Sequence, residues 1–249
     1  MKHTGFICAV LFCLAAASAA AGSFSVSPTR VHFDANRRTA AITLRNSDPT
    51  APLTIQASLV DWDQQGPEDI YTETRDLIAT PPVFTVPPGG EQVLRIALRR
   101  QPDAREELAY RIFFQEVPQR AAATTNALNV ALRVGVPVFV QAGTPDEGMY
   151  VDWQVARTGA EEVTLFAENS GDTHVQVTGF NLLAGASTAA QVGEARYVLP
   201  GNRVSWTVKV PQGTDLSALR IDGRSDMGNF AADVTGTTLA RPDARSAAR

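Results

Sequence analysis

The sequence of 249 residues has only two cysteines, Cys8 and Cys13. Both lie in a short apolar run from Phe6 to Ala17, which follows a basic start and precedes a stretch of small residues. This pattern is typical of a secretory signal peptide, so we expect residues 1–21 to be cleaved off. The exported protein would then contain no cysteine and would fold without disulfides.

Histidine is scarce as well. Loss of His3 with the signal leaves His32 and His174, which fall in different predicted domains without clustered ligands around them. We interpret His32 as a strand residue and His174 as a surface residue beside a turn. So few histidines argue against Ser-His-Asp catalysis and a histidine-based metal site. We therefore expect no enzymatic activity, no metal and no cofactor.

The chain also lacks an excess of positive charge and a second long apolar run. Its 22 Lys and Arg residues face 26 Asp and Glu residues, for a net charge of −4. That balance argues against nucleic acid as a partner. The single apolar run is too short to span a bilayer comfortably, so we expect no stable membrane insertion.

What the chain does have is apolar residues at every second position, the pattern of β-strands with one buried face. No segment before residue 141 keeps a helical period over a dozen residues. We predict strands at residues 24–33, 39–45, 53–62, 92–98, 108–117 and 126–140, and then at 150–155, 162–168, 174–180, 196–199, 203–210, 219–221 and 229–234.

Turn-forming and proline-rich segments divide these strands. The polar segment 64–74 is predicted to be a hairpin loop, and the adjacent prolines Pro81 and Pro82 favour an edge segment or a change of strand. The best domain boundary is a small, polar linker at residues 142–149. Short strands with regular turns indicate an all-β fold of two sandwiches, at residues 22–141 and 150–236. Residues 237–249 lack apolar periodicity and are predicted to be a mobile tail.

The strand at residues 126–137 has the clearest alternation. Leu128, Val130, Leu132 and Val134 point to one face of an extended strand, with polar or small residues between them. Such a strand is either an ordinary half-buried strand or one whose apolar face is offered to a second protein. The strand pattern alone leaves both interpretations open.

Five local strings occur in order along the chain. They are Ser-Pro-Thr-Arg at 27–30, Ala-Thr-Pro-Pro at 79–82, residues 105–111 leading into Glu-Val-Pro at 116–118, the strand at 126–137, and Asp-Met-Gly at 226–228. Together they resemble the periplasmic chaperones of the chaperone–usher pilus-assembly family, in a divergent branch. The resemblance implies two immunoglobulin-like domains in a boomerang, a periplasmic location, and pilus subunits and an outer-membrane usher as partners.

The resemblance also implies a mechanism. A pilus subunit is an immunoglobulin-like fold that lacks its last strand, and the chaperone fills the open groove with its own strand. Here the donor strand would span about residues 126–140 and insert Leu128, Val130, Leu132 and Val134. No covalent chemistry is needed.

In the family, two basic residues in the cleft between the domains bind the subunit's C-terminal carboxylate. Arg30 matches the first of them. Pro137 aligns with the second, usually a lysine, and proline carries no charge and no N–H. We expect Arg111 to supply the second positive charge, with Arg133 as the other candidate. The alternative is that Arg111 pairs with a carboxylate such as Glu107 or Glu116.

A salt bridge commonly joins the two domains in this family. Glu116 and Asp226 match its two acids, but Gln141 occupies the position of its arginine. Two acids without a cation repel each other, so the bridge must be rebuilt or absent. We expect the orientation of the domains to rely more on apolar contacts.

Two other classes of function compete with the chaperone hypothesis. One is a structural immunoglobulin-like pilus or cell-surface subunit, which the fold alone does not exclude. The lack of a disulfide and of an N-terminal donor extension argues against it. The other is an enzyme on a sandwich fold, either a hydrolase or a copper–zinc site, and the scarcity of histidine disfavours both. A free chaperone with an apolar donor strand could also self-associate.

Overall fold

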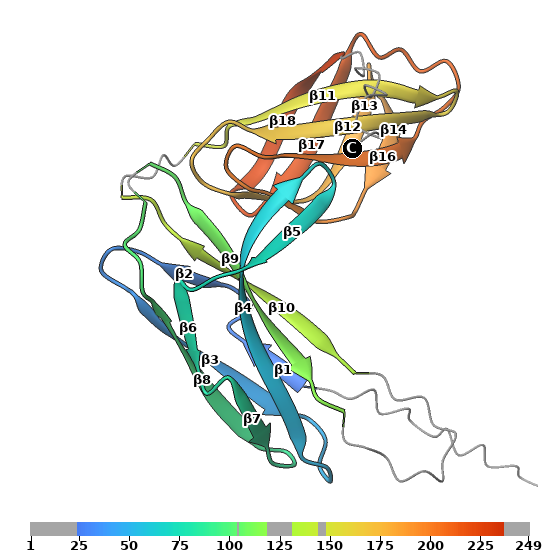
Figure 1. Cartoon of the computed structure of the whole chain (residues 1–249). Coiled ribbons are helices and arrows are strands. Elements are labelled where there is room, and N and C mark those ends of the chain that lie inside the picture. Colours follow the sequence, from blue (N-terminus) through green and yellow to red (C-terminus); the bar gives the residue numbers. More distant parts are fainter. Residues whose placement is uncertain (1–23, 104, 119–130, 144–147, 237–249) are drawn as a thin grey trace, which may run out of the picture.

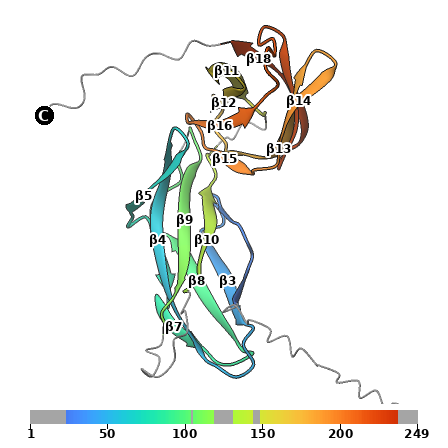
Figure 2. The same cartoon turned by 90° about the vertical axis from the view of Figure 1, so that its right-hand side faces the viewer.

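The computed structural model describes residues 24–103, 105–118, 131–143 and 148–236, and every regular element in these ranges is a β-strand. Two β-sandwich domains meet at an angle, which gives the boomerang shape seen in Figures 1 and 2. The all-β, two-domain prediction is confirmed. The predicted signal peptide and tail lie outside the described residues. Within them, no helix is long and apolar enough to cross a membrane.

The first domain consists of two sheets that pack face to face. One has the order β1-β3-β8-β6 and the other the order β2-β10-β9-β4-β5, with β7 also paired to β4. The strands are β1 (Phe24–Ser27), β2 (Val31–Phe33), β3 (Thr39–Asn46), β4 (Leu53–Gln65), β5 (Glu68–Glu73), β6 (Leu77–Thr80), β7 (Val83–Val86), β8 (Glu91–Leu98), β9 (Leu108–Glu116) and β10 (Arg133–Val140).

Two segments of this domain change sheets at prolines. β1 pairs with β3 in the first sheet, and β2 pairs in parallel with β10 in the second, with Pro28 between them. Likewise β6 pairs with β8 and β7 pairs with β4 on the two sides of Pro81 and Pro82. This pairing confirms the predicted change of strand at Pro81 and Pro82. Proline suits such a position because it has no N–H to donate within a sheet.

One sequence expectation in this domain is wrong. Residues 64–74 do not form a polar loop, because β4 continues to Gln65 and β5 returns beside it from Glu68. Gly66, with a φ of 61°, forms the turn. The segment reads as polar because both faces of this projecting hairpin are largely exposed. Its tip reaches the second domain, where the Pro67 carbonyl accepts a hydrogen bond from Arg196.

The second domain is one curled sheet of eight strands in which β11 and β18 pair in parallel. Its core is built around Trp153, Phe180 and Trp206. The strands are β11 (Val151–Gly159), β12 (Glu162–Asn169), β13 (Val175–Ala184), β14 (Ser187–Val192), β15 (Arg196–Val198), β16 (Arg203–Lys209), β17 (Leu219–Ser225) and β18 (Gly228–Gly236).

A small apolar cluster joins the domains. It contains Trp62 from β4, Phe139 from β10 and Leu199, which follows β15, all almost fully buried. Phe139 points away from the first domain's own core because its neighbours Val138 and Val140 fill that core. Its ring stacks on His174 with centroids 3.6 Å apart. Apolar contact between the domains is therefore present, as expected.

Replacing Phe139 with alanine should loosen the domain junction. A buried Phe→Ala change costs about 3–5 kcal/mol, and here the lost contacts include Trp62 within the first domain and His174 across the junction. We expect a lower melting temperature by calorimetry and an altered radius of gyration by small-angle scattering. Phe84→Ala, at a buried position on β7 within the first domain, is the matched control and should lower only the stability. An unchanged scattering curve for Phe139→Ala would contradict this role.

Candidate functional site

The described part of the predicted donor strand starts at residue 131, so Leu128 and Val130 lie outside it. Leu132 and Val134 are half-buried and pack against the edge of the first domain's core. They lie on the same face as Val136 and Val138, which are buried in that core. The apolar row therefore leaves the core toward the N-terminal end of β10.

One edge of β10 is open. β10 pairs with β9 along its whole length, from Arg133 to Val140. On its other edge, the pairing with β2 covers only Val138 to Val140. Among the described residues, the edge from Arg133 to Pro137 has no neighbouring strand. An unpaired strand edge beside an apolar row is a template for β-sheet pairing with another chain.

Arg30 reaches across the domain junction. Its Nη1 lies 2.8 Å from Asp226 Oδ2, and its Nη2 donates to Gln176 Oε1 (2.6 Å) and to the Tyr197 hydroxyl (2.9 Å). All three partners belong to the second domain. The hydrogen bonds between described residues use three of the five N–H groups of the guanidinium. Arg30 is thus held in one orientation but keeps donor capacity.

Asp226 is firmly ionised. Burial alone would raise its pKa, but the His174 ring, the Gln176 N–H (2.8 Å) and Arg30 outweigh burial and hold the pKa at about 2. Asp226 lies between β17 and β18 and contacts Arg30 of the first domain. The structure therefore places Asp226 at the junction where the sequence expects an interdomain contact.

Arg111 lies on the other side of the junction cluster. Its guanidinium carbon sits 3.8 Å from the centroid of the Trp62 ring. Nη1 donates to the Tyr71 hydroxyl (2.6 Å) and lies 3.4 Å from Asp69 Oδ2. Arg111 therefore does pair with a carboxylate, as the alternative interpretation expects, but the partner is Asp69 on β5 and not Glu107 or Glu116. The Arg111 Nε is buried and has no hydrogen-bond partner among the described residues.

Pro137 stands directly opposite Arg111 in the β9–β10 register. The position where a basic residue is expected therefore has a basic neighbour on the adjacent strand. Gly135 gives this neighbour its space: a Cβ there would lie 3.1 Å from Arg111 Cδ and 2.9 Å from a carbon of Phe113. Arg133, the other candidate, instead stacks on Phe113 at 3.8 Å.

The predicted interdomain role of Glu116 does not fit the structure. Glu116 lies at the end of β9 far from the second domain, where its carboxylate accepts a hydrogen bond from the Leu132 N–H (3.3 Å). Glu107, just before β9, contacts the second domain instead. Its Oε1 contacts His174 Nδ1 (2.5 Å), and its N–H donates to the Asp172 carbonyl (2.8 Å).

His174 is also placed differently from the prediction. It is not a surface residue, since only 5% of it is exposed. Its ring lies 6.2 Å from that of His32, so the two histidines of different domains meet at the junction. Within the described residues, no group of three or more His, Cys, Asp or Glu side chains could hold a metal ion. Sequence spacing gave no signal for this meeting.

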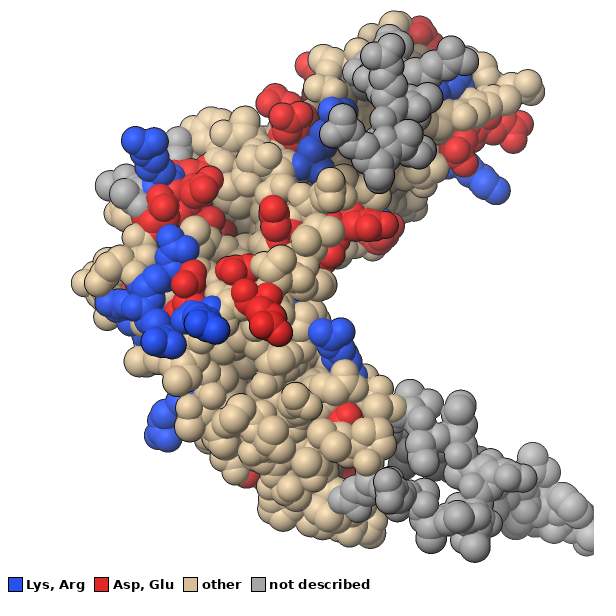
Figure 3. Space-filling model, in the orientation of Figure 1, with Lys and Arg blue, Asp and Glu red and all other residues tan. Residues whose placement is uncertain are grey.

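Charge gathers where the domains meet, and the lower part of the first domain is largely uncharged in the view of Figure 3. A cleft of about 400 Å³ opens at the junction, lined by side chains of both domains that include Trp62, Asp69, Arg111, Arg196 and Tyr197. Tyr197 links the two predicted anchors, because it accepts from Arg30 and packs edge-on against Trp62 at 5.2 Å. Arg30 and Arg111 therefore border the same aromatic pair.

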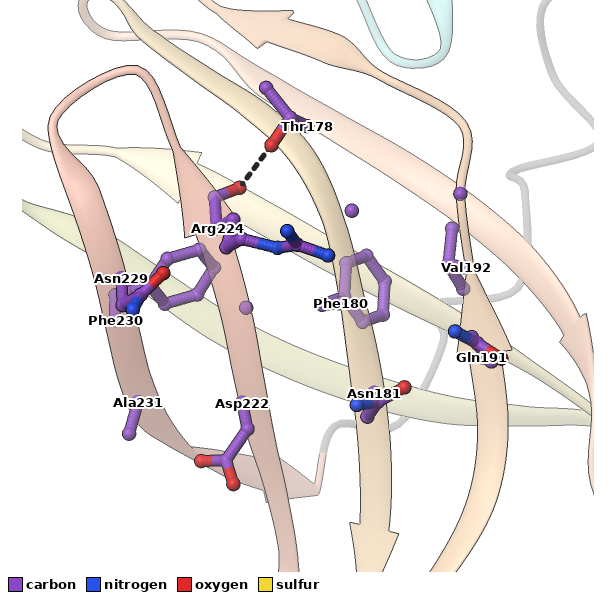
Figure 4. Close-up of a pocket in the computed structure, with 13 residues that line it drawn as sticks. Thr178, Phe180, Asn181, Gln191, Val192, Asp222, Arg224, Asn229, Phe230 and Ala231 are labelled. Carbon is purple, nitrogen blue, oxygen red and sulfur yellow. Dashed lines mark hydrogen bonds between the residues drawn. The ribbon is translucent and has the colours of Figure 1, made fainter.

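A second hollow, of about 1020 Å³, lies within the second domain on strands β13, β14, β17 and β18 (Figure 4). Phe180 and Phe230 form its apolar part, and Arg224 lies above them, with its carbonyl accepting a hydrogen bond from Thr178 (3.0 Å). None of the site residues predicted from the sequence lines it. The predicted anchors Arg30 and Arg111 lie instead at the domain junction.

Comparisons with known proteins agree with this architecture. The family model "Pili and flagellar-assembly chaperone, PapD N-terminal domain" matches residues 23–145. Chaperone protein PapD of Escherichia coli is 28% identical over 207 residues, which cover 80% of each chain. Chaperone protein LpfB of Salmonella typhimurium is 30% identical over 164 residues, 63% of this chain and 67% of the relative.

Solved structures share the fold. The chaperone–subunit pre-assembly complex CsuC–CsuE of Acinetobacter baumannii, from archaic chaperone–usher Csu pili, contains a chain with a TM-score of 0.65 and 20% identity, covering 87% of this chain and 100% of that one. The YadV chaperone has a TM-score of 0.60 and 17% identity, covering 84% of this chain and 98% of that one.

Proposed function

Since this chain belongs to the family of PapD-like pilus-assembly chaperones, we propose that it binds pilus subunits by donating a β-strand and passes them to an outer-membrane usher. The observation that supports the proposal most directly is the unpaired edge of β10 among the described residues. This edge and the row of apolar side chains on β10, including Leu132 and Val134, form one surface. A subunit that lacks its last strand could pair its backbone with this edge and bury the row in its own groove.

Burial of the apolar row supplies the driving force. Each branched aliphatic contributes about 1.5–3 kcal/mol when fully buried, so Leu128, Val130, Leu132 and Val134 together contribute about 6–12 kcal/mol at most. Leu132 and Val134 are already half-buried, which reduces their share. The costs of association and ordering oppose this gain. Transfer of the subunit to an usher therefore needs no covalent step and no nucleotide.

We further propose that Arg30 binds the subunit's C-terminal carboxylate and that Arg111 provides the second positive charge. Support for Arg30 comes from its fixed orientation and from the N–H groups that make no hydrogen bond to another described residue. Arg111 lies opposite Pro137, and its contact with Asp69 is a loose 3.4 Å. A carboxylate entering the junction cleft could share Arg111 with Asp69.

The proposed site of action is the periplasm, with export directed by residues 1–21 and cleavage after Ala21. The proposed domains are residues 22–141 and 150–236, joined by the linker at 142–149. The function requires only binding, so we assign no catalytic residue and no cofactor.

The test is co-expression of the full chain with the pilus subunits encoded beside it, followed by a periplasmic pull-down on the tagged chain. A soluble complex of one chain with one subunit is the expected result. If the chain polymerises by itself and captures none of these subunits, it is a structural subunit instead. A self-associated form that dissolves when a subunit is supplied would fit the chaperone, because the same open edge would be covered in both states.

A further inference from the structure

His174 lies between two carboxylates from different domains. Its Nδ1 is 2.5 Å from Glu107 Oε1 of the first domain, and its Nε2 is 3.5 Å from Asp226 Oδ2 of the second. The side chains of His174 and Glu107 are 5% and 4% exposed, so water does little to screen them. Two acids facing one imidazole, the buried Glu107 and Asp226 with 19% of its side chain exposed, favour the doubly protonated, positively charged form of the ring.

Asp226 Oδ2 has a second partner. Arg30 Nη1 lies 2.8 Å from the same oxygen, and Asp226 Oδ1 accepts the Gln176 N–H. The junction thus holds two negative charges, on Glu107 and Asp226, and the positive charge of Arg30. With a charged His174 the four groups are neutral in sum. With a neutral His174 they carry one uncompensated negative charge at a buried site, which is costly.

We propose that His174 is the cation that balances Glu107 and Asp226 across the domain junction, and that it thereby leaves Arg30 able to bind the C-terminal carboxylate of a pilus subunit. The inference rests on the proposed function of Arg30. His174 acts as a positioning residue, because it touches Asp226 and not the subunit.

The physical reason is competition for Arg30. When His174 is charged, it shares the negative charge of Asp226 Oδ2 with Arg30. A subunit carboxylate that approaches Arg30 then adds one negative charge to a neutral cluster. When His174 is neutral, the same carboxylate enters a cluster that is already negative, and Arg30 is the one cation of the four groups that still pairs with Asp226. Binding should therefore weaken as His174 loses its proton.

The other titratable groups around the ring favour this assignment of the proton. His32 on β2 lies 6.2 Å away, and burial together with the charge of His174 lowers the pKa of His32. The ring of Tyr197 on β15 lies 5.7 Å from that of His174. The guanidinium of Arg30 contacts Asp226 and not the imidazole. Burial would lower the pKa of His174, but Asp226 and Glu107 outweigh it and raise that pKa.

The direction of the pH effect follows. A group whose pKa is raised by folding stabilises the folded state fully below its unfolded value, about 6.5 for histidine, and that contribution is lost as the pH rises through the raised value. The same protonation should strengthen carboxylate binding. By reciprocity, a bound carboxylate should raise the pKa of His174 further.

The experiment uses the mature chain and two peptides made of the last ten residues of the co-purified subunit, one with a free C-terminal carboxylate and one capped as the amide. Affinity is measured by calorimetry from pH 6 to pH 9, and NMR of the histidine rings follows their titration. We expect the free-carboxylate peptide to bind about tenfold more weakly at high pH, a typical coupling between two sites. His174 should titrate above the ordinary histidine value and His32 below it.

Variants separate this inference from the proposed function. His174→Gln should bind the free-carboxylate peptide about tenfold more weakly at pH 6 and lose the pH dependence, and His32→Gln is the matched control that keeps both. A flat wild-type pH profile, or a His174→Gln profile equal to that of the wild type, overturns the role of His174. If His174 fails this test but Arg30→Ala loses affinity for the free-carboxylate peptide, the proposed role of Arg30 stands without the role of His174. If Arg30→Ala binds normally, the anchor and the inference both fail.

Discussion

Arg30→Ala is expected to reduce the affinity for a pilus subunit by at least about 30-fold, because truncating one partner of a hydrogen-bonded charge pair costs about 2–5 kcal/mol. The loss has two sources. The subunit carboxylate loses its guanidinium donors, and Asp226 loses its 2.8 Å partner at the junction. Calorimetry with the purified subunit measures the change.

A control variant and a variant of the second proposed anchor accompany this prediction. Arg45→Ala removes an exposed arginine on β3 that pairs with Glu91 at 3.5 Å, and it should leave the affinity unchanged. Arg111→Ala should cause a smaller loss than Arg30→Ala, because the Arg111 guanidinium makes its one short contact with the Tyr71 hydroxyl and a 3.4 Å contact with Asp69. Wild-type affinity in Arg30→Ala, with the fold intact, would remove Arg30 from the site.

Leu132→Asp is expected to abolish co-purification of the subunit. The change removes a branched aliphatic worth about 1.5–3 kcal/mol on burial and puts a carboxylate into an apolar groove, where a charge without a partner is far more costly. Leu132 is only half-buried at the open end of the domain's own core, so the chaperone itself should stay folded. The measurement is the amount of subunit recovered in the periplasmic pull-down, with circular dichroism to check folding.

Val93→Asp is the matched control. Val93 is 42% exposed on β8, in the sheet that does not contain β10. The same chemical change there should leave the complex intact. Recovery of normal amounts of subunit with a folded Leu132→Asp variant would refute strand donation by this row.

The local alternation of apolar and polar residues predicted most of the strands. Alternating apolar residues located β3, β4, β8 and β9 and most strands of the second domain, because a strand with one buried face repeats every two residues. The Pro81–Pro82 pair marked the change of sheet between β6 and β7, since proline cannot donate within a ladder. The pattern failed for the exposed hairpin of β4 and β5 and for β14. Their mostly exposed faces leave no apolar period to detect.

The sequence by itself determined the β-sandwich class, the apolar face shared by Leu132 and Val134, and the family to which the chain belongs. Only the tertiary structure decided which charges meet at the junction. Glu107 and His174 are 67 residues apart in the chain, and Arg30 and Asp226 are 196 apart. Periodicity tells which face of a strand a side chain occupies, but the partner across a domain junction depends on how two separately folded domains dock. For that reason the acid of β9 and its approach that meets the second domain is Glu107 and not Glu116, and its partner there is His174.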